Sequence, residues 1–111
     1  MPEKPFIAIG VTKDRAGVWA GHFGMAPFYF IYDQQGQLVE VRPNPHGAGS
    51  GQGHHDDPRL IARLLSDCRV FIGRRFGHES QRKLARNLGV QPVSTAAKTP
   101  GEAIQQFLGA E

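Results

Sequence analysis

The sequence FYFIYDQQGQLVEVR occupies residues 28–42 and contains the clearest structural signal of the chain. Its aromatic and β-branched beginning is typical of a strand over Phe28–Asp33. The polar residues Gln34-Gln35-Gly36 follow as a tight turn. A second strand is expected over Gln37–Arg42, although Leu38 interrupts a strict alternation of polar and apolar residues. The stretch therefore predicts a β-hairpin.

The segments around this hairpin extend it to an α/β order. The apolar run Phe6–Thr12 predicts a buried strand before it. The order expected along the whole chain is β-β-β-α-β-α-β-α, with the later strands at Cys68–Ile72 and Val90–Ser94 and helices over 56–67, 79–88 and 99–108. The first three strands are expected to be antiparallel neighbours, and the later ones parallel because helices connect them. Pro92 favours an edge position for the last strand.

Length and composition limit the class of protein. The 111 residues are enough for one domain with one core, so a single domain over 1–111 is expected. No apolar run approaches the length of a transmembrane helix, and no secretory signal is expected at the N-terminus. A single cysteine, Cys68, excludes an intramolecular disulfide and a zinc site built from several cysteines. These features favour a cytoplasmic protein.

Charge and glycine are unevenly distributed. Eight of the thirteen basic residues lie between Arg59 and Arg86, where Asp67 and Glu79 are the only acidic residues. Four of the fourteen glycines fall within Gly47–Gly53, and the chain has five histidines. A basic half, a glycine-rich stretch and nearby histidines together indicate an anionic or metal-containing ligand.

Several short motifs resemble those of one known family. The first is HFGMAPF at residues 22–28, which continues into the strand FIYD at residues 30–33. The others follow in the order typical of the family: Asn44-Pro45, Leu64–Cys68, Ile72–Gly77 and Leu88–Val93. On these motifs the chain is identified as similar to the dinitrogenase iron–molybdenum cofactor biosynthesis proteins, which are NifX-like proteins and the C-terminal part of NifB-like proteins.

The resemblance carries implications for fold and function. It implies a ribonuclease-H-like α/β fold with a mixed five-stranded sheet. It also implies a small, non-enzymatic carrier or chaperone for an iron–sulfur or iron–molybdenum cluster or its precursor. The expected partners are metallocofactor assembly or acceptor proteins, and the expected state is a monomer or weak homodimer. The family's cofactor-binding histidine corresponds to His22, in one motif with Phe23 and Gly24.

His22 is also a candidate from its own surroundings. It follows Gly21, which permits close approach of the backbone, and it precedes Phe23-Gly24 in the connection between the first two strands. A neutral imidazole is a good terminal ligand for iron or molybdenum, and an imidazolium can pair with an anionic cluster. The alternative is that His22 caps a turn through a backbone carbonyl.

Two further groups of residues are candidates for the same ligand. His46 and His54 flank the glycine-rich stretch, which could close over a cluster or form an ordinary solvated loop. Gly73, Arg74 and Arg75 follow the fourth expected strand, at the strand end where α/β sheets bind ligands. The arginines offer planar donors to an anion. They are equally compatible with a solvated turn.

Other chemistry finds less support. Cys68, at the start of a strand, is interpreted as a packed apolar residue, and Met25 is expected to pack against Phe28. The first strand carries no carboxylate for a two-metal nuclease site, and no nucleophile–base pair is evident, so no enzymatic activity is expected. The alternative to a cluster carrier is a protein- or nucleic-acid-binding module that uses the basic face, although no nucleic-acid recognition motif supports nucleic acid.

Overall fold

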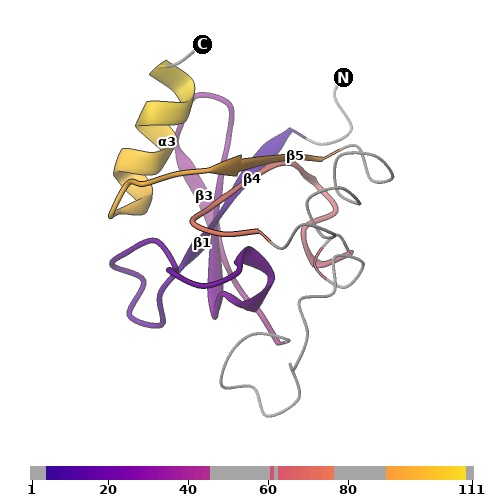
Figure 1. Ribbon diagram of the computed structural model, residues 1–111. Helices are drawn as coiled ribbons and strands as arrows, with labels where there is room; N and C mark the ends of the chain where they lie inside the picture. The colour runs from indigo at the N-terminus through magenta and orange to yellow at the C-terminus, as the bar shows by residue number, and fades with distance from the viewer. Residues whose placement is uncertain (1–4, 46–60, 62, 77–89, 110–111) are drawn as a thin grey trace.

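The computed structural model describes residues 5–45, 61, 63–76 and 90–109 and contains one five-stranded sheet (Figure 1). The order across the sheet is β3-β2-β1-β4-β5. β1 pairs antiparallel with β2 and parallel with β4, β2 pairs antiparallel with β3, and β4 pairs parallel with β5. The strands are β1 (Phe6–Val11), β2 (Phe28–Tyr32), β3 (Leu38–Pro43), β4 (Cys68–Gly73) and β5 (Gln91–Ser94). The predicted mixed sheet is confirmed, including the edge position of Pro92 in β5.

The hairpin of β2 and β3 contains an irregularity that explains its imperfect alternation. Ile31 is paired with Glu40, but Tyr32 is paired with Leu38, so the register skips Val39. A β-bulge of this kind places neighbouring residues out of the usual alternation. Leu38 and Val39 are accordingly about half exposed on this edge strand.

β1 is the central strand of the sheet, and its alternate residues are buried in two separate cores. Ile7, Ile9 and Val11 belong to the core beneath the C-terminal helix, whereas Ala8 belongs to the opposite core. A central strand covered on both faces is apolar at successive positions, as the run from Phe6 indicated. The core opposite the helix also contains Phe23, Ala26, Tyr29, Ile31, Ile61, Leu65, Cys68, Phe71 and Val90.

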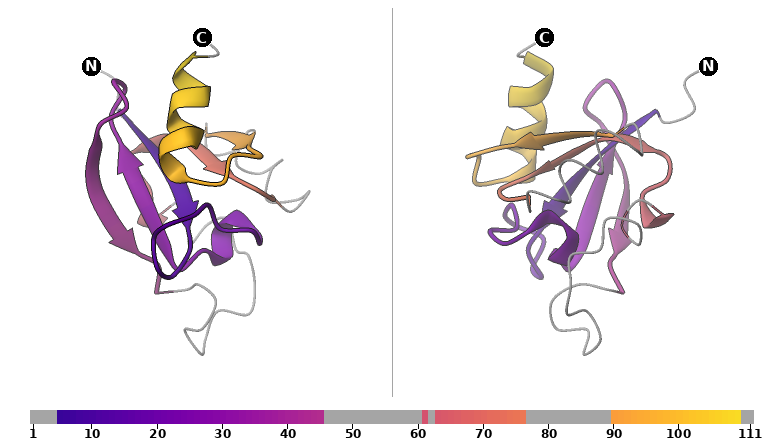
Figure 2. Two further views of the ribbon diagram at one scale, coloured as in Figure 1. Left: turned by 90° about the vertical axis from the view of Figure 1, so that its left-hand side faces the viewer. Right: turned by 45° about the vertical axis from the view of Figure 1, so that its right-hand side comes forward.

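The helix α3 (Pro100–Gly109) covers one face of the sheet (Figure 2). The sequence Thr99-Pro100-Gly101-Glu102 at its start is a capping box: the Glu102 N–H donates to Thr99 Oγ1 (3.2 Å), and the Thr99 hydroxyl contacts Glu102 Oε1 (3.2 Å). Ala103 and Ile104 are buried against the sheet. The short 3₁₀ turn η1 (Phe23–Met25), between β1 and β2, was not predicted from the sequence.

The remaining predicted helices fall mostly outside the described residues. Of the helix expected over 56–67, Ile61, Arg63 and Leu64 are helical, and residues 65–67 form a turn. The helix expected over 79–88 lies entirely outside. Within the described part of the chain, no helix has the length and apolar character needed to cross a bilayer.

Arg42 connects the edge of the sheet to the segment before β4. Its Nη1 donates to Leu64 O (2.9 Å) and Asp67 Oδ1 (3.0 Å), and its Nη2 donates to Glu40 Oε1 (2.7 Å). The hydrogen bond from Arg42 lowers the pKa of Asp67, and a separate bond from Arg42 lowers the pKa of Glu40. Both bonds raise the pKa of Arg42. One side chain therefore ties strand β3 to the segment Leu64–Asp67.

Replacing Arg42 tests this connection. We expect Arg42→Met to lower the free energy of unfolding by about 1–3 kcal/mol at pH 7, because it leaves a half-buried carbonyl and Asp67 without their donor. Since the pKa of Asp67 is lowered in the folded state, this stabilisation is complete above the ordinary value of 3.8 and is lost as pH falls below it. Urea denaturation at pH 7 and pH 3 should thus show a smaller difference between the two proteins in acid. A difference independent of pH would contradict the ion pair.

Candidate functional site

The candidate site lies at the carboxyl ends of the parallel strands. β1, β4 and β5 end at Val11, Gly73 and Ser94, at the edge of the sheet opposite the β2–β3 turn (Figure 1). Residues 12–27, which connect β1 to β2, lie at this edge together with the segments that follow β4 and β5 (Figure 2). In α/β sheets this edge is where ligands bind.

His22 and Arg75 lie side by side at this edge. The two residues form an isolated parallel β-bridge, in which the Phe23 N–H donates to Arg75 O (2.8 Å). Both side chains are exposed. The His22 carbonyl accepts the Met25 N–H (2.9 Å), but the His22 side chain makes no capping hydrogen bond to η1. The predicted meeting of the His22 segment with the arginine turn is therefore seen in the backbone.

Close packing holds the His22 segment against the turn that follows β4. The Phe23 ring is 2% exposed and stacks on Phe71, with ring centroids 4.9 Å apart. A Cβ at Gly73 would lie only 3.0 Å from Phe23 Cδ1, and a Cβ at Gly10 would lie 3.0 Å from the Ala26 Cβ. Because both glycines lack a side chain, η1 can lie directly on the ends of β1 and β4.

Gly21 permits a similar contact on the other side of His22. A Cβ at this position would lie 2.9 Å from Trp19 Nε1. The Trp19 indole packs against the same core as Phe23, and its buried N–H has no hydrogen-bond partner among the described residues. The only tryptophan of the chain therefore lies next to the His22 segment, a neighbour that the sequence alone did not indicate.

The two arginines differ in their surroundings. Arg74 is half-buried, and its Nη2 donates to Ala97 O (2.9 Å), which ties the end of β4 to the connection between β5 and α3. Its buried Nε has no partner in the described part of the chain. Arg75 is exposed. The geometry thus gives Arg74 a bracing contact and leaves the Arg75 side chain facing solvent.

Further positive charge lies in the segments that follow β1 and β5 at the same end of the sheet. Lys13 and Arg15, after β1, and Lys98, after β5, are exposed. The Val18 N–H donates to Lys98 O (2.9 Å), so the segments after β1 and β5 are in contact. Within residues 12–27, 74–76 and 95–99 the only carboxylate is Asp14. This edge of the sheet therefore favours an anionic ligand.

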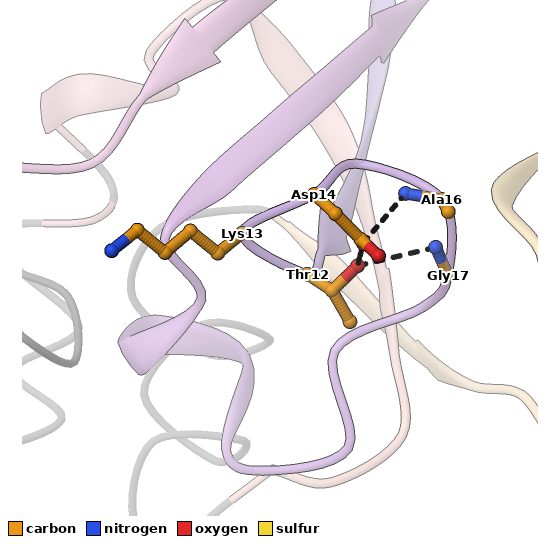
Figure 3. A pocket seen from close by; sticks show the side chains of 5 residues that line it. All are labelled: Thr12, Lys13, Asp14, Ala16 and Gly17. Atoms are coloured by element: carbon orange, nitrogen blue, oxygen red, sulfur yellow. Dashed lines mark hydrogen bonds between the residues drawn. The ribbon is translucent and has the colours of Figure 1, made fainter.

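The Asp14 carboxylate is already engaged by its own turn. It accepts hydrogen bonds from the Thr12 hydroxyl and from the Ala16 N–H (3.0 Å), and these bonds lower the pKa of Asp14. Figure 3 shows both side chains folded into the turn, with Lys13 pointing away from it. A shallow recess of about 550 Å³ borders this turn. The Asp14 carboxylate therefore stays ionised, and it is a single negative charge beside Lys13 and Arg15 in the same turn.

The structure brings some of the predicted site residues together, and others lie outside the described part of the chain. His22, Phe23, Gly24, Gly73, Arg74 and Arg75 are brought together, although Phe23 and Gly24 are buried and support the site from below. His46 and His54 lie outside the described residues. Among the residues that are described, no group of three or more histidine, cysteine, aspartate or glutamate side chains could hold a metal ion.

Cys68 is part of the core. Its side chain is fully buried among the residues around Phe71, as the packed-residue interpretation predicted. Burial, with a smaller contribution from the neighbouring Asp67 carboxylate, raises the pKa of the Cys68 thiol to about 12. A neutral, buried thiol is neither a good nucleophile nor an accessible iron ligand.

Comparison with known proteins identifies a family. The family model described as "Dinitrogenase iron-molybdenum cofactor" matches residues 5–110. No curated protein is significantly similar in sequence.

Two solved structures are similar over nearly the whole chain. The NMR structure of a "putative NifB protein" from Thermotoga is 27% identical, with a TM-score of 0.68, and the alignment covers 93% of this chain and 86% of that one. The apo form of the orange protein from Desulfovibrio gigas is 19% identical, with a TM-score of 0.75 and coverage of 99% and 92%. The latter similarity concerns the fold alone.

The buried state of Cys68 leads to a chemical test. At pH 8, we expect iodoacetamide to modify Cys68 at least roughly a hundredfold more slowly in the native protein than in urea, because the native thiol is both un-ionised and inaccessible. Mass spectrometry of samples taken over time measures both rates. Equal rates would show that the thiol is available to reagents, and would make Cys68 a candidate ligand again.

Proposed function

The chain belongs to the dinitrogenase iron–molybdenum cofactor family, and on this premise we propose that it is a small carrier in metallocofactor assembly. Its cargo is an iron–sulfur or iron–molybdenum cluster, or a precursor of one, held transiently at the carboxyl edge of the sheet. The similarity to a Thermotoga protein described as NifB-like supports the same role. The partners are then assembly or acceptor proteins, and the carrier itself catalyses no reaction.

One observation supports this proposal above the others, which is the bridge between His22 and Arg75. It brings an imidazole-bearing segment next to an exposed guanidinium, at an edge where the described residues 12–27, 74–76 and 95–99 contain several cations and one carboxylate. His22 would supply a nitrogen ligand to a metal of the cargo. Arg75 would donate hydrogen bonds to its anionic sulfur or oxygen atoms, while Arg74 holds the turn in place.

The composition is consistent with a temporary hold on the cargo. Stable iron–sulfur clusters are usually bound by several cysteine thiolates, but this chain has one cysteine, and it is buried. A cluster at this edge would therefore depend on histidine, arginine and backbone donors. Such a site releases its cargo more easily than a set of four thiolates, as delivery to an acceptor requires.

Further parts of the proposal concern the rest of the chain. We infer that His46 and His54, which flank the glycine-rich stretch, contribute to the same site. The sheet order, in which β2 alone runs opposite to the other strands, supports a ribonuclease-H-like topology. The family match over residues 5–110 supports a single domain over 1–111. A cytoplasmic monomer or weak homodimer fits this role.

Anaerobic reconstitution with ferrous iron and sulfide tests the proposal. We expect the wild-type protein to retain iron and visible absorption after desalting, and His22→Ala to lose most of both because it removes the nitrogen ligand. Arg75→Gln should retain less iron than the matched control Arg69→Gln. Arg69 is an exposed arginine of β4 at the other end of the strand. Iron content and absorption spectra provide the measurement.

Two results would contradict the carrier proposal. One is an equal absence of iron in the wild type and in His22→Ala. The other is equal retention by Arg75→Gln and Arg69→Gln together with full retention by His22→Ala, which would place any bound iron elsewhere. If the protein retains no iron but binds nucleic acid in a salt-sensitive way, the alternative of a binding module with a basic face is favoured.

A further inference from the structure

In the part of the chain that the structure describes, Asn44 is the only residue with a carboxamide or charged side chain that is buried as a whole. It follows directly after β3 and is 8% exposed. Its Nδ2 lies 2.8 Å from Ala26 O and 3.1 Å from Gly24 O, and its backbone N–H donates to Pro27 O (2.9 Å). All three carbonyls belong to η1 or to the residues immediately after it.

Tyr29 extends these hydrogen bonds. Its hydroxyl donates to Phe23 O (2.7 Å) and lies 3.2 Å from Asn44 Nδ2. The hydroxyl proton is directed to Phe23 O, so the hydroxyl oxygen is left as an acceptor, and the two N–H protons of the Asn44 amide are shared among three oxygen atoms. Asn44 and Tyr29 together therefore supply donors to the carbonyls of Phe23, Gly24 and Ala26. We call this pair of side chains the carbonyl clamp.

The chemistry of the carbonyl clamp is directional. The three acceptors around Asn44 Nδ2 are all oxygen atoms, so the amide must present its NH₂ group to them. A carboxylate in the same place would oppose its lone pairs to those of the two carbonyls. A methyl group would leave the buried carbonyls without a donor, which is costly in a desolvated site.

The carbonyl clamp acts on the same turn that carries His22. Its hydrogen bonds hold η1 from the side of β2 and β3, while the Phe23 N–H holds it from the side of β4 by donating to Arg75 O. His22 immediately precedes η1, and its own carbonyl accepts the Met25 N–H. The place of the imidazole relative to Arg75 thus depends on both sets of bonds.

We propose that Asn44 is a positioning residue, which with Tyr29 fixes η1 so that His22 faces the cargo beside Arg75. This role rests on the proposed function, because the cargo is the ligand that His22 is positioned to bind. Asn44 itself is buried beneath the turn and acts on the ligand only through His22.

Variants of the carbonyl clamp can be compared with a destabilising variant elsewhere in the fold. Asn44→Ala removes the donor, Asn44→Asp keeps the shape but not the donors, and Tyr29→Phe removes the hydroxyl alone. The control is Thr99→Ala, which removes the cap of α3 on the other face of the sheet and has a destabilising effect of its own. Urea denaturation places the four variants on one scale of stability.

Two readouts separate positioning from stability. The first is the affinity for the cluster formed from ferrous iron and sulfide. We expect Asn44→Ala and Asn44→Asp to lower this affinity about tenfold or more, and Tyr29→Phe to lower it less. Folded Thr99→Ala should bind the cluster as tightly as the wild type. The second uses the protein without added iron. There the amide NMR signals of residues 22–26 and the fluorescence of Trp19 should change in the clamp variants, and remain as in the wild type in Thr99→Ala.

The outcomes distinguish this inference from the proposed function. If the wild type binds no cluster, the proposed function fails, and the NMR signals of residues 22–26 still decide whether Asn44 positions the turn. Unchanged signals and unchanged binding in the clamp variants would overturn the inference. The inference is also overturned if, in all four variants including Thr99→Ala, the loss of cluster affinity is proportional to the loss of unfolding free energy. Should Asn44→Ala and Asn44→Asp not fold, Tyr29→Phe removes only one hydroxyl and supplies the same comparison.

Discussion

The rest of the site depends on the packing of Phe23 over the ends of β1 and β4. Both strands have a glycine at the point of contact, Gly10 in β1 and Gly73 in β4. Phe23 stacks on Phe71 and Phe76, and it leaves too little room for a Cβ at Gly73, which would lie 3.0 Å from Phe23 Cδ1. Aromatic pairs of this kind contribute about 0.5–1.5 kcal/mol each beyond the burial of their area. A methyl group at Gly73 would push the ring away. Through this packing, a connection between two antiparallel strands is held on the end of a third strand.

Much of the fold followed from local patterns. The strand boundaries, the antiparallel and parallel pairings and the capping box at Thr99 could be predicted because each rests on neighbours in the sequence. The bulge at Val39 could not be located, since it depends on how two strands pair. The turn η1 was also missed: three residues containing a glycine and stabilised by Asn44, about twenty positions away, have no periodicity of their own.

The site shows the same division between local and distant information. The family motif made His22 a candidate ligand, and strand order placed the Gly73–Arg75 turn at the same edge of the sheet, so the proximity of the two segments was predictable. The difference between Arg74 and Arg75 was not, because it arises from a single contact with Ala97 in a distant segment. Neither were the roles of Trp19 and Asn44, whose partners become neighbours only in the folded chain.

The distribution of charge connects this packing to the proposed role. The most direct test of that role is to locate the bound iron on the protein. His22 and Arg75 lie at the same end of the sheet as Lys13, Arg15 and Lys98, whereas Arg42 is paired with Asp67 and Glu40. Adding the cluster in steps to ¹⁵N-labelled protein should broaden the amide NMR signals of residues 21–24 and 73–76 first. Those of residues 34–37, at the opposite end of the sheet, should stay sharp. Broadening that is uniform, or centred away from His22 and Arg75, would contradict a cargo site at the carboxyl edge of the sheet.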